Sequence, residues 1–266
     1  MIAACIDLPE LFFYHPLMQT RILYAGDTTL ATAASYLAGV MKHHGFAFDY
    51  VPSDQPLPMN LPSGGHGLYI FSDYPAANIA TPCAEAIVDN IRQGAGLLML
   101  GGWASYHGLD GNYNASPLAK ALPVTISGTD DRINCPQPCL VEKLCDHPIL
   151  ADLPFNKPPG IGGYNSFVAN ANSQALLGAR HFGVSFDGGG FKFSKGGLAP
   201  LLVVGEYGGG RTAALATDAA PHWVGGLVDW GEARVEARAD GADAIEVGDF
   251  YARFFAQLIG WTMGRD

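Results

Sequence analysis

Short apolar runs alternate with amphipathic segments along the first 100 residues of the chain. Helical spacing of apolar residues predicts one helix that Asp27 or Thr28 caps and Gly45 ends, and a second that Thr81 caps and Gly94 closes. Four apolar runs have the length and aliphatic content of buried parallel strands. They occupy residues 21–26, 46–51, 67–71 and 97–100. Strands that alternate with helices predict a mainly parallel sheet with helices on both faces, joined by right-handed crossovers.

The pattern changes after residue 122. Residues 123–198 hold short apolar segments separated by Gly, Asn and Pro, without helical periodicity, which predicts an antiparallel or irregular elaboration. Residues 199–218 predict two strands joined at Gly208 to Gly210, a hairpin that returns the chain to the main sheet. Residues 232–246 are charged and Ala-rich and predict an exposed insertion. The apolar stripe of residues 247–261 predicts a closing helix docked on the sheet.

Composition narrows the class of protein. A chain of 266 residues with 48% hydrophobic residues can bury a sizeable core, and we expect residues 1–266 to form a single domain. The formal charge of -10, with scattered basic residues, argues against nucleic acid and anionic membranes as partners. No apolar run is long enough for a membrane span.

Two further features indicate the compartment. The first 18 residues are apolar but lack a basic start and are interrupted by Asp7, Pro9 and Glu10, so we do not expect a signal peptide. The five cysteines are an odd number in a large chain, which favours reduced thiols. We therefore expect a cytoplasmic protein.

Polar residues follow several of the predicted strands. Asp27 follows the first strand, Asp73 the third, and Asp218 with His222 the late hairpin, while the fourth strand runs into a glycine corner at residues 101–108. In open α/β sheets, ligands bind beyond the carboxyl ends of the strands. Each residue also has a simpler reading: Asp27 as a helix cap, Asp73 as a turn former and His222 as a helix-start residue. Their shared edge is what favours a functional site.

The order of these motifs resembles the class I glutamine amidotransferase superfamily, and more closely its branch of glutamine amidotransferase-like proteins. The resemblance runs through most of the chain and is carried by YAGD at 24, SDYP at 72, LLMLGGWASYHG at 97, LPV at 122, HPI at 147 and GGGRTAALATDAAPHW at 208. It implies the flavodoxin-like three-layer sandwich of that superfamily, also related to the fold of the trehalose-utilisation (ThuA-like) proteins.

The resemblance also implies where a glutaminase nucleophile would stand. The superfamily mechanism needs a Cys in a G-x-C-x-G turn, activated by a His, with backbone N–H groups as the oxyanion hole. The matching turn here is Gly101-Gly102-Trp103-Ala104-Ser105, so Trp103 takes the place of the Cys. Ser105 as a shifted nucleophile lacks a following glycine at the right spacing. We expect no glutaminase activity.

A histidine and a carboxylate remain available. Asp218 and His222 stand where the superfamily has its His-x-Glu, and with His107 of the glycine corner they offer a general acid and base pair or three ligands of a metal site. The spacing of these three residues matches no zinc signature, so we assign no metal and no cofactor.

Two other segments allow alternatives. Cys135, Cys139 and Cys145, followed by His147, contain only part of a zinc pattern, and free thiols are the favoured interpretation. Gly188 to Gly190 are suited to an anion cradle, but they open no obvious helix and favour a flexible loop, such as a flap over the edge of the sheet.

Three functions follow from these residues. In the first, the edge binds a small polar, sugar-like ligand. Trp103, Tyr106 and Trp223 would contact the ligand with their aromatic rings, and Asp27, Asp73 and Asp218 would accept hydrogen bonds from its hydroxyls. Gly102 and Ser105 of the glycine corner would also contact the ligand. In the second, the same pocket performs hydrolase, lyase or isomerase chemistry with His222 or His107 as base. In the third, the chain is a structural subunit of a homo-oligomer.

Overall fold

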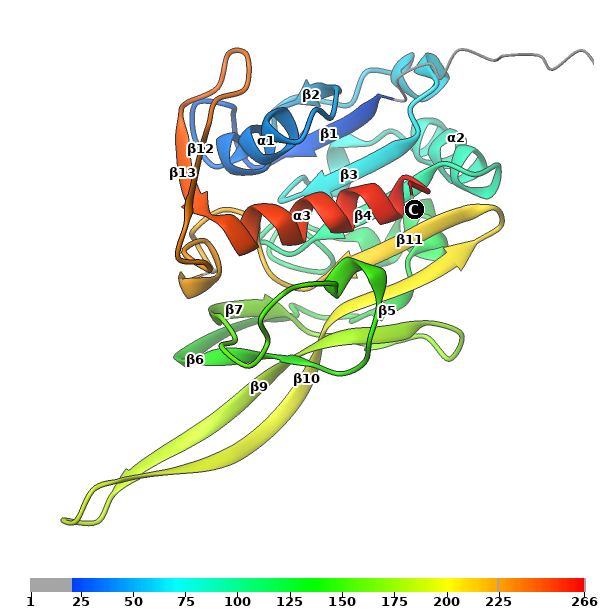
Figure 1. Cartoon of the computed structure of the whole chain (residues 1–266). Helices are drawn as coiled ribbons and strands as arrows, with labels where there is room; N and C mark the ends of the chain where they lie inside the picture. The colour runs from blue at the N-terminus through cyan, green and yellow to red at the C-terminus, as the bar shows by residue number, and fades with distance from the viewer. Residues whose placement is uncertain (1–20, 224, 266) are drawn as a thin grey trace, which may run out of the picture.

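The computed structural model describes residues 21–223 and 225–265. Residues 1–18, for which we expect no signal peptide, lie outside the described residues, as does Cys5. Most of the chain is organised around one nine-stranded sheet with the strand order β2-β1-β3-β4-β11-β10-β9-β6-β7. Figure 1 shows helix α3 (Asp249–Thr262) lying across the parallel strands, and two long antiparallel strands, β9 and β10, projecting from the body of the molecule.

Five neighbouring strands form the parallel part of the sheet, as the alternating pattern predicts. They are β1 (Ile22–Gly26), β2 (Phe48–Val51), β3 (Leu68–Ser72), β4 (Gly96–Leu100) and β11 (Gly210–Leu215). All residues of β1, β3 and β4 are buried, which explains their unbroken apolar sequences. The predicted bounds of β1, β2, β3 and β4 agree with the structure to within two residues.

Three α-helices accompany the parallel strands. They are α1 (Ala34–His43), α2 (Thr81–Arg92) and α3 (Asp249–Thr262). Helices α1 and α3 contact each other, and α3 also contacts β4 and β11. The β1-α1-β2 and β3-α2-β4 connections move in opposite directions along the sheet, so right-handed crossovers put α1 and α2 on opposite faces.

Helix α1 begins later than the sequence predicts. Asp27 and Thr28 adopt left-handed backbone conformations, with φ of 52° and 63°, and are not its cap. The carbonyl of Asp27 instead accepts the N–H of Ala34, the first helical residue, at 2.8 Å. The prediction that Asp27 or Thr28 caps this helix is therefore wrong: the Asp27 carboxyl is engaged elsewhere.

The remaining four strands of the main sheet are antiparallel. They are β6 (Arg132–Lys143), β7 (Gly160–Asn165), β9 (Gln174–Phe186) and β10 (Phe191–Tyr207). The predicted elaboration thus extends the main sheet itself, and β10 is longer than expected because it starts well before residue 199. Its turn into β11 contains Gly208, at a φ of 61°, as the hairpin prediction requires.

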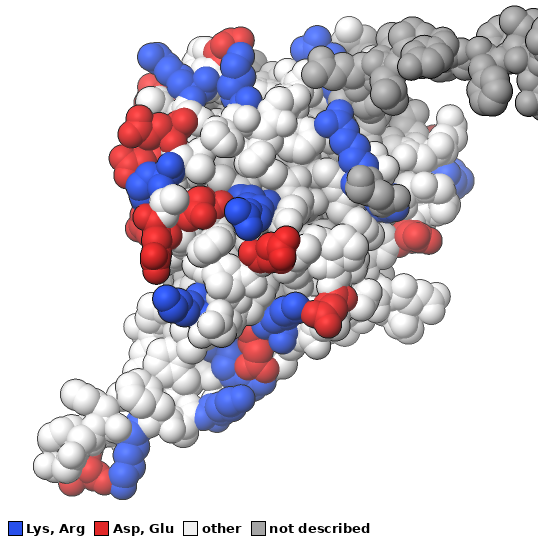
Figure 2. Space-filling model, viewed as in Figure 1, with Lys and Arg blue, Asp and Glu red and all other residues white. Residues whose placement is uncertain are grey.

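The outer ends of β9 and β10 form an arm that projects from the body of the molecule (Figure 1). Gly188 to Gly190 lie between these strands at the tip of the arm, so the expectation of a flap over the sheet edge is wrong. Phe186, Phe191 and Phe193 are largely exposed on the arm. Figure 2 shows few charged residues along it apart from those near its tip, where Lys192 pairs with Asp187.

Smaller elements complete the fold. Two short strand pairs are β5 (Val124–Ile126) with β8 (Phe167–Ala169), and β12 (Arg234–Ala237) with β13 (Ile245–Gly248). Single 3₁₀ turns are η1 (Leu61–Gly64), η2 (Ala76–Asn78), η3 (Tyr113–Ala115), η4 (Pro117–Ala121), η5 (Pro148–Leu150) and η6 (Gly225–Leu227). The segment predicted as an exposed insertion is therefore a hairpin that contacts α1 and α3. No helix among the described residues is long and apolar enough to cross a membrane.

The end of β4 depends on a glycine. A Cβ atom at Gly101 would lie 2.0 Å from the carbonyl oxygen of Ala216, which is backbone and cannot turn aside. We predict that Gly101→Ala destabilises the protein by about 2 kcal/mol or more, because the strands after β4 and β11 must separate. Chemical denaturation of the purified variant measures this loss.

Gly260, in helix α3, is the matched control. No heavy atom lies within 4 Å of a Cβ placed there, so Gly260→Ala should stabilise the protein by about 0.5–1 kcal/mol through helix propensity. Equal effects of the two substitutions would contradict the role given to Gly101.

Candidate functional site

Asp27, at the carboxyl end of β1, is bound to the neighbouring strand. Its Oδ2 accepts a hydrogen bond from the Tyr24 hydroxyl at 2.5 Å, and its Oδ1 accepts one from the Ser72 hydroxyl at 3.0 Å. Its backbone N–H donates to the carbonyl of Ser72 at 2.7 Å. The side chain is buried, and burial raises the pKa of Asp27 well above its ordinary value, with the nearby Asp218 carboxylate adding to the effect.

Asp73, at the end of β3, binds the glycine corner that follows β4. Its Oδ1 accepts the Ala104 N–H at 2.5 Å, and the Trp103 N–H also donates to this carboxylate. Its own N–H donates to the Ser105 hydroxyl at 3.0 Å. A Cβ atom at Gly102 would lie 2.7 Å from Asp73 Oδ1, so the close approach needs glycine. Burial raises the pKa of Asp73, and the amide donors oppose that rise.

The glycine corner is also tied to the antiparallel strands by Asn165, which sequence reasoning missed. The fully buried Asn165 accepts the Gly102 N–H at 2.9 Å and donates to the Gly102 carbonyl at 3.2 Å and to Asp131 at 2.7 Å. Asp131 in turn accepts the backbone N–H of His107 at 2.9 Å. No local pattern in the sequence indicates these bonds, because the partners lie 24 to 63 residues apart.

His222 and Asp218 form a pair in the loop after β11. His222 Nδ1 lies 3.0 Å from Asp218 Oδ2, and the Ala220 N–H donates to the other carboxylate oxygen at 2.8 Å. The Asp218 side chain is 3% exposed and the His222 side chain 59%. The hydrogen bond from Asp218 raises the pKa of His222, and partial burial opposes it. Since this bond uses Nδ1, the imidazole can exchange a proton through Nε2.

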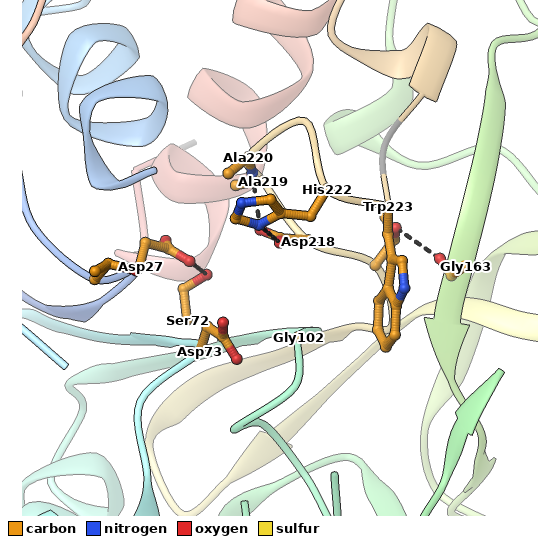
Figure 3. A network of polar contacts seen from close by, with 12 residues as sticks. Asp27, Ser72, Asp73, Gly102, Gly163, Asp218, Ala219, Ala220, His222 and Trp223 are labelled. Carbon is orange, nitrogen blue, oxygen red and sulfur yellow. Dashed lines mark hydrogen bonds and ion pairs between the residues drawn. The ribbon is translucent and has the colours of Figure 1, made fainter. Parts of the chain in front are cut away.

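These residues share the carboxyl edge of the parallel strands. Figure 3 shows His222 and Asp218 on one side, and Asp27, Ser72 and Asp73 on the other. Their charges interact: Asp218 raises the pKa of both Asp27 and Asp73, and Asp73 raises the pKa of His222. The predicted meeting of Asp27, Asp73, Asp218 and His222 at one edge therefore agrees with the structure.

The structure gives three other predicted residues different positions. Tyr106 is fully buried, and its hydroxyl donates to the carbonyls of Met99 and Leu215, so no ring face is available for a ligand. The Ser105 side chain is buried against Asp73. The imidazole of His107 pairs with Asn114 at 2.8 Å, and it forms no group with Asp218 and His222 close enough to share a metal ion. Tyr106 and Ser105 thus support the corner, and their prediction as ligand contacts is corrected.

The two tryptophans differ in exposure. Trp103 is 52% exposed, and the Arg132 guanidinium lies 4.7 Å from its ring centre. Trp223 is 5% exposed, and its indole N–H donates to Asn134 at 2.9 Å. A Cβ atom at Gly163 would come within 2.7 Å of the Trp223 ring, which explains the small residue there. Of the two, Trp103 is the ring that a ligand can reach.

The four described cysteines take no part in the hydrogen bonds of the glycine corner and the His222–Asp218 pair. Cys83 is buried in α2, and Cys145 lies 3.5 Å from the Ala175 carbonyl. Cys135 and Cys139 lie together, with His181 and without Cys145 or His147. In the described part of the chain, these three residues form the single group of His, Cys, Asp or Glu side chains close enough to share a metal ion. The alternative of a metal held by His107, Asp218 and His222 is therefore not supported.

Two cavities lie away from this edge. One of about 520 Å³ at the base of the arm is lined by apolar residues and by charged side chains such as Arg180 and Lys195. Another of about 800 Å³ lies beside Trp230 and the start of α3. Neither includes the carboxylates and the histidine described above, and convergent polar groups are what distinguish a chemical site from a surface groove.

Comparisons with known proteins agree with this architecture. A family model described as putative glutamine amidotransferase matches residues 68–235. The chain belongs to this family. No curated protein matches the chain.

Several solved structures share the fold of this amidotransferase-like chain. Cytoplasmic protein STM3548 from Salmonella typhimurium is 22% identical, with a TM-score of 0.69 over 91% of this chain and 98% of its own. Cytoplasmic protein STM1381 from Salmonella typhimurium LT2 is 24% identical, with a TM-score of 0.70 over 91% and 99%. A ThuA-like protein from Parabacteroides merdae is 12% identical, with a TM-score of 0.55 over 92% and 90%. These similarities establish a mixed α/β fold with a large central sheet.

The His222–Asp218 pair gives a prediction for titration. In the amidotransferase-like chain, the His222 pKa should lie above the ordinary value of about 6.5, and Asp218→Asn should lower it because the amide carries no charge. NMR titration of the imidazole C–H signals measures both values, with His222→Gln identifying the resonance. An unchanged His222 pKa in Asp218→Asn would contradict the pairing.

The same pair makes stability depend on pH. In the wild type, the stabilisation from this pair is present below pH about 6.5 and is lost as pH rises through the His222 pKa of the folded protein.

Asp27 gives a prediction for stability. Since its pKa is raised in the folded protein, the folded state loses stability as pH rises from about 4 through the folded pKa. Asp27→Asn, which cannot ionise, should raise Tm by about 2–4 °C at pH 8 and have little effect near pH 4. Thermal unfolding at both pH values tests this.

Asp240→Asn is the matched control for Asp27→Asn, because the Asp240 side chain is 94% exposed and pairs with Lys42 at the surface. It should change Tm little at either pH. If Asp27→Asn had a lower Tm than the wild type at pH 8, the ionisable carboxyl of Asp27 would not be destabilising the folded protein, and the prediction would be wrong.

Proposed function

We propose that the protein is a glutamine amidotransferase-like protein without glutaminase activity, which binds a small polar, sugar-like ligand at the carboxyl edge of its parallel strands. The observation that carries this proposal is the gathering of Asp73, Asp218 and His222 at one edge. Carboxylates accept hydrogen bonds from ligand hydroxyls, and Trp103, a residue of the glycine corner, offers an exposed aromatic ring.

The surroundings of the corner support the lack of glutaminase activity. Glutaminase chemistry needs backbone N–H groups directed at the substrate oxyanion. Here the N–H groups of Trp103 and Ala104 donate to the resident Asp73 carboxylate. The four described cysteines also contribute no thiol to the edge.

We extend the proposal to the fold class, the compartment and the assembly of the protein. We assign the parallel part of the sheet to the flavodoxin-like three-layer class, supported by the order β2-β1-β3-β4-β11 and by helices on both faces. We assign all 266 residues to a single domain in the cytoplasm, with no nucleic acid or membrane partner. A homo-oligomer is supported by the exposed aromatic side chains of the arm, Phe186, Phe191 and Phe193.

A second function is favoured by the His222–Asp218 geometry. A buried carboxylate that orients an accessible imidazole is the arrangement of a general base and its orienting partner. In an isomerase or lyase of this kind, His222 Nε2 would take a proton from a carbon next to a ligand carbonyl, and Asp218 would stabilise the imidazolium.

Ligand binding can be tested with a panel of monosaccharides and sugar acids. We expect at least one to raise Tm in a concentration-dependent way, because a ligand that binds only the folded state stabilises it. Asp73→Asn and Trp103→Ala should weaken this binding about 10-fold or more, since each removes one contact worth at least about 1.4 kcal/mol. Isothermal titration calorimetry gives the affinities, and Asp240→Asn should bind as the wild type does.

Other outcomes of the same panel separate the functions. Solvent deuterium incorporation into a bound sugar, lost in His222→Gln, would establish the proton-transfer enzyme. Release of glutamate from glutamine, or alkylation of a cysteine by a glutamine analogue, would contradict the absence of glutaminase activity. No binding by any member of the panel would contradict the sugar-like ligand.

A further inference from the structure

Two cysteines and a histidine from neighbouring antiparallel strands meet at a site separate from the one described above. Cys135 Sγ lies 3.4 Å from Cys139 Sγ, and Cys139 Sγ lies 3.5 Å from His181 Nδ1. All three ligand atoms lie within 4.8 Å of one another. We propose that Cys135, Cys139 and His181 bind one thiophilic metal ion, for which Zn²⁺ is the probe.

Strand irregularity brings the two thiols together. Asn134 pairs with Gly163 and Cys139 with Ile161, so five steps along β6 match two steps along β7. The extra residues form a bulge that contains Pro136 and Pro138, which have no N–H for the ladder. A regular strand would keep residues four apart far from each other, whereas the bulge folds Cys135 back beside Cys139.

The third ligand comes from the next strand. Leu140 pairs with Arg180 in the antiparallel ladder between β6 and β9, which sets Cys139 opposite His181. His181 Nε2 lies 2.9 Å from the Tyr164 hydroxyl. If Nε2 carries the proton and donates it to Tyr164, the lone pair of Nδ1 faces Cys139. A metal-bound histidine is ordinarily oriented in this way by a partner on its other nitrogen.

The distances suit a shared ion. With Zn–S near 2.3 Å and Zn–N near 2.05 Å, tetrahedral angles put two sulfurs about 3.8 Å apart and a sulfur and a nitrogen about 3.6 Å apart. The separations of 3.4 Å and 3.5 Å need only small movements to reach these values. A disulfide would need the sulfurs at about 2.05 Å.

The ligand types select the class of metal. Two sulfurs and an imidazole favour Zn²⁺ or Cu⁺ over Mg²⁺ and Ca²⁺, which prefer oxygen. Two thiolates balance the charge of one Zn²⁺. Cys139 is buried while Cys135 and His181 are partly exposed, so an ion can enter from solvent and keep a fourth position for water.

An ion here would stabilise the bulge close to the functional edge. Asn134, next to Cys135, accepts the indole N–H of Trp223, which directly follows His222. The metal is therefore proposed as a structural clamp on the strands that support this edge, and it takes no part in the ligand binding proposed there.

The test uses the full-length protein, reduced and stripped with a chelator, and titrated with Zn²⁺ against a chromophoric competitor. We expect one Zn²⁺ per chain, and with Co²⁺ the strong visible absorption and thiolate charge-transfer bands of a tetrahedral site. Cys135→Ser, Cys139→Ser and His181→Ala should each weaken binding about 100-fold or more. Tyr164→Phe should weaken it about 10-fold, as loss of an outer-shell partner does.

Cys145→Ser and Cys5→Ser are the controls, and each should keep one Zn²⁺ per chain at wild-type affinity. Circular dichroism of each variant without metal checks that it folds, and if Cys139→Ser does not fold, the partly exposed Cys135 and His181 carry the test. Absence of stoichiometric binding, or equal loss in Cys145→Ser, would overturn the proposal. A two-hydrogen mass loss in air that joins Cys135 to Cys139, without metal binding to the reduced protein, would identify a redox pair and also overturn it.

Discussion

The hydrogen bonds of the buried residue Asn165 hold together the edge at which the candidate site lies. Asn165 binds both polar groups of Gly102 and the carboxylate of Asp131, and its own N–H donates to the carbonyl of Ala216. One residue thus joins β7, the corner after β4 and the end of β11, through its side chain and its backbone N–H. Since a buried amide left without partners costs about 1–3 kcal/mol for each lost bond, this junction has a strongly preferred geometry.

That junction positions groups that repel one another. Asp27, Asp73 and Asp218 are brought to one edge, and their burial and mutual charge raise the pKa of the first two. A fold selected for stability alone would not place three carboxyls there, because each raised pKa is free energy withdrawn from the folded state at neutral pH. Carboxyl groups with shifted pKa values are concentrated at functional sites in proteins. This is the physical reason for proposing that a ligand binds at this edge.

The sequence was sufficient to predict the parallel half of the molecule. Strands β1, β3 and β4 are buried along their whole length and are therefore largely apolar, and Asp27, Asp73 and Asp218 follow the carboxyl ends of β1, β3 and β11. The rule that ligands bind at this edge does not depend on side-chain detail, so the grouping of these residues could be foreseen.

Other features depend on contacts between distant segments. The local sequence around Tyr106 does not indicate whether its ring faces solvent or the core. In the structure the ring is buried, and the hydroxyl lies within hydrogen-bond distance of the carbonyls of Met99 and Leu215. The Cys135 and Cys139 spacing suggested Cys145 and His147 as companions, whereas His181, 42 residues beyond Cys139, is the neighbour. Such pairings follow from strand register, and a bulge that changes the register has no reliable signal in a single sequence.

The antiparallel extension is consequently more than an addition to the sheet. It supplies Asn165 and Asp131 to the glycine corner, Asn134 to Trp223, and the cysteines and histidine of the proposed metal site. The geometry of the proposed site therefore depends on Asn134, Asn165 and Asp131 of this extension as well as on the parallel strands.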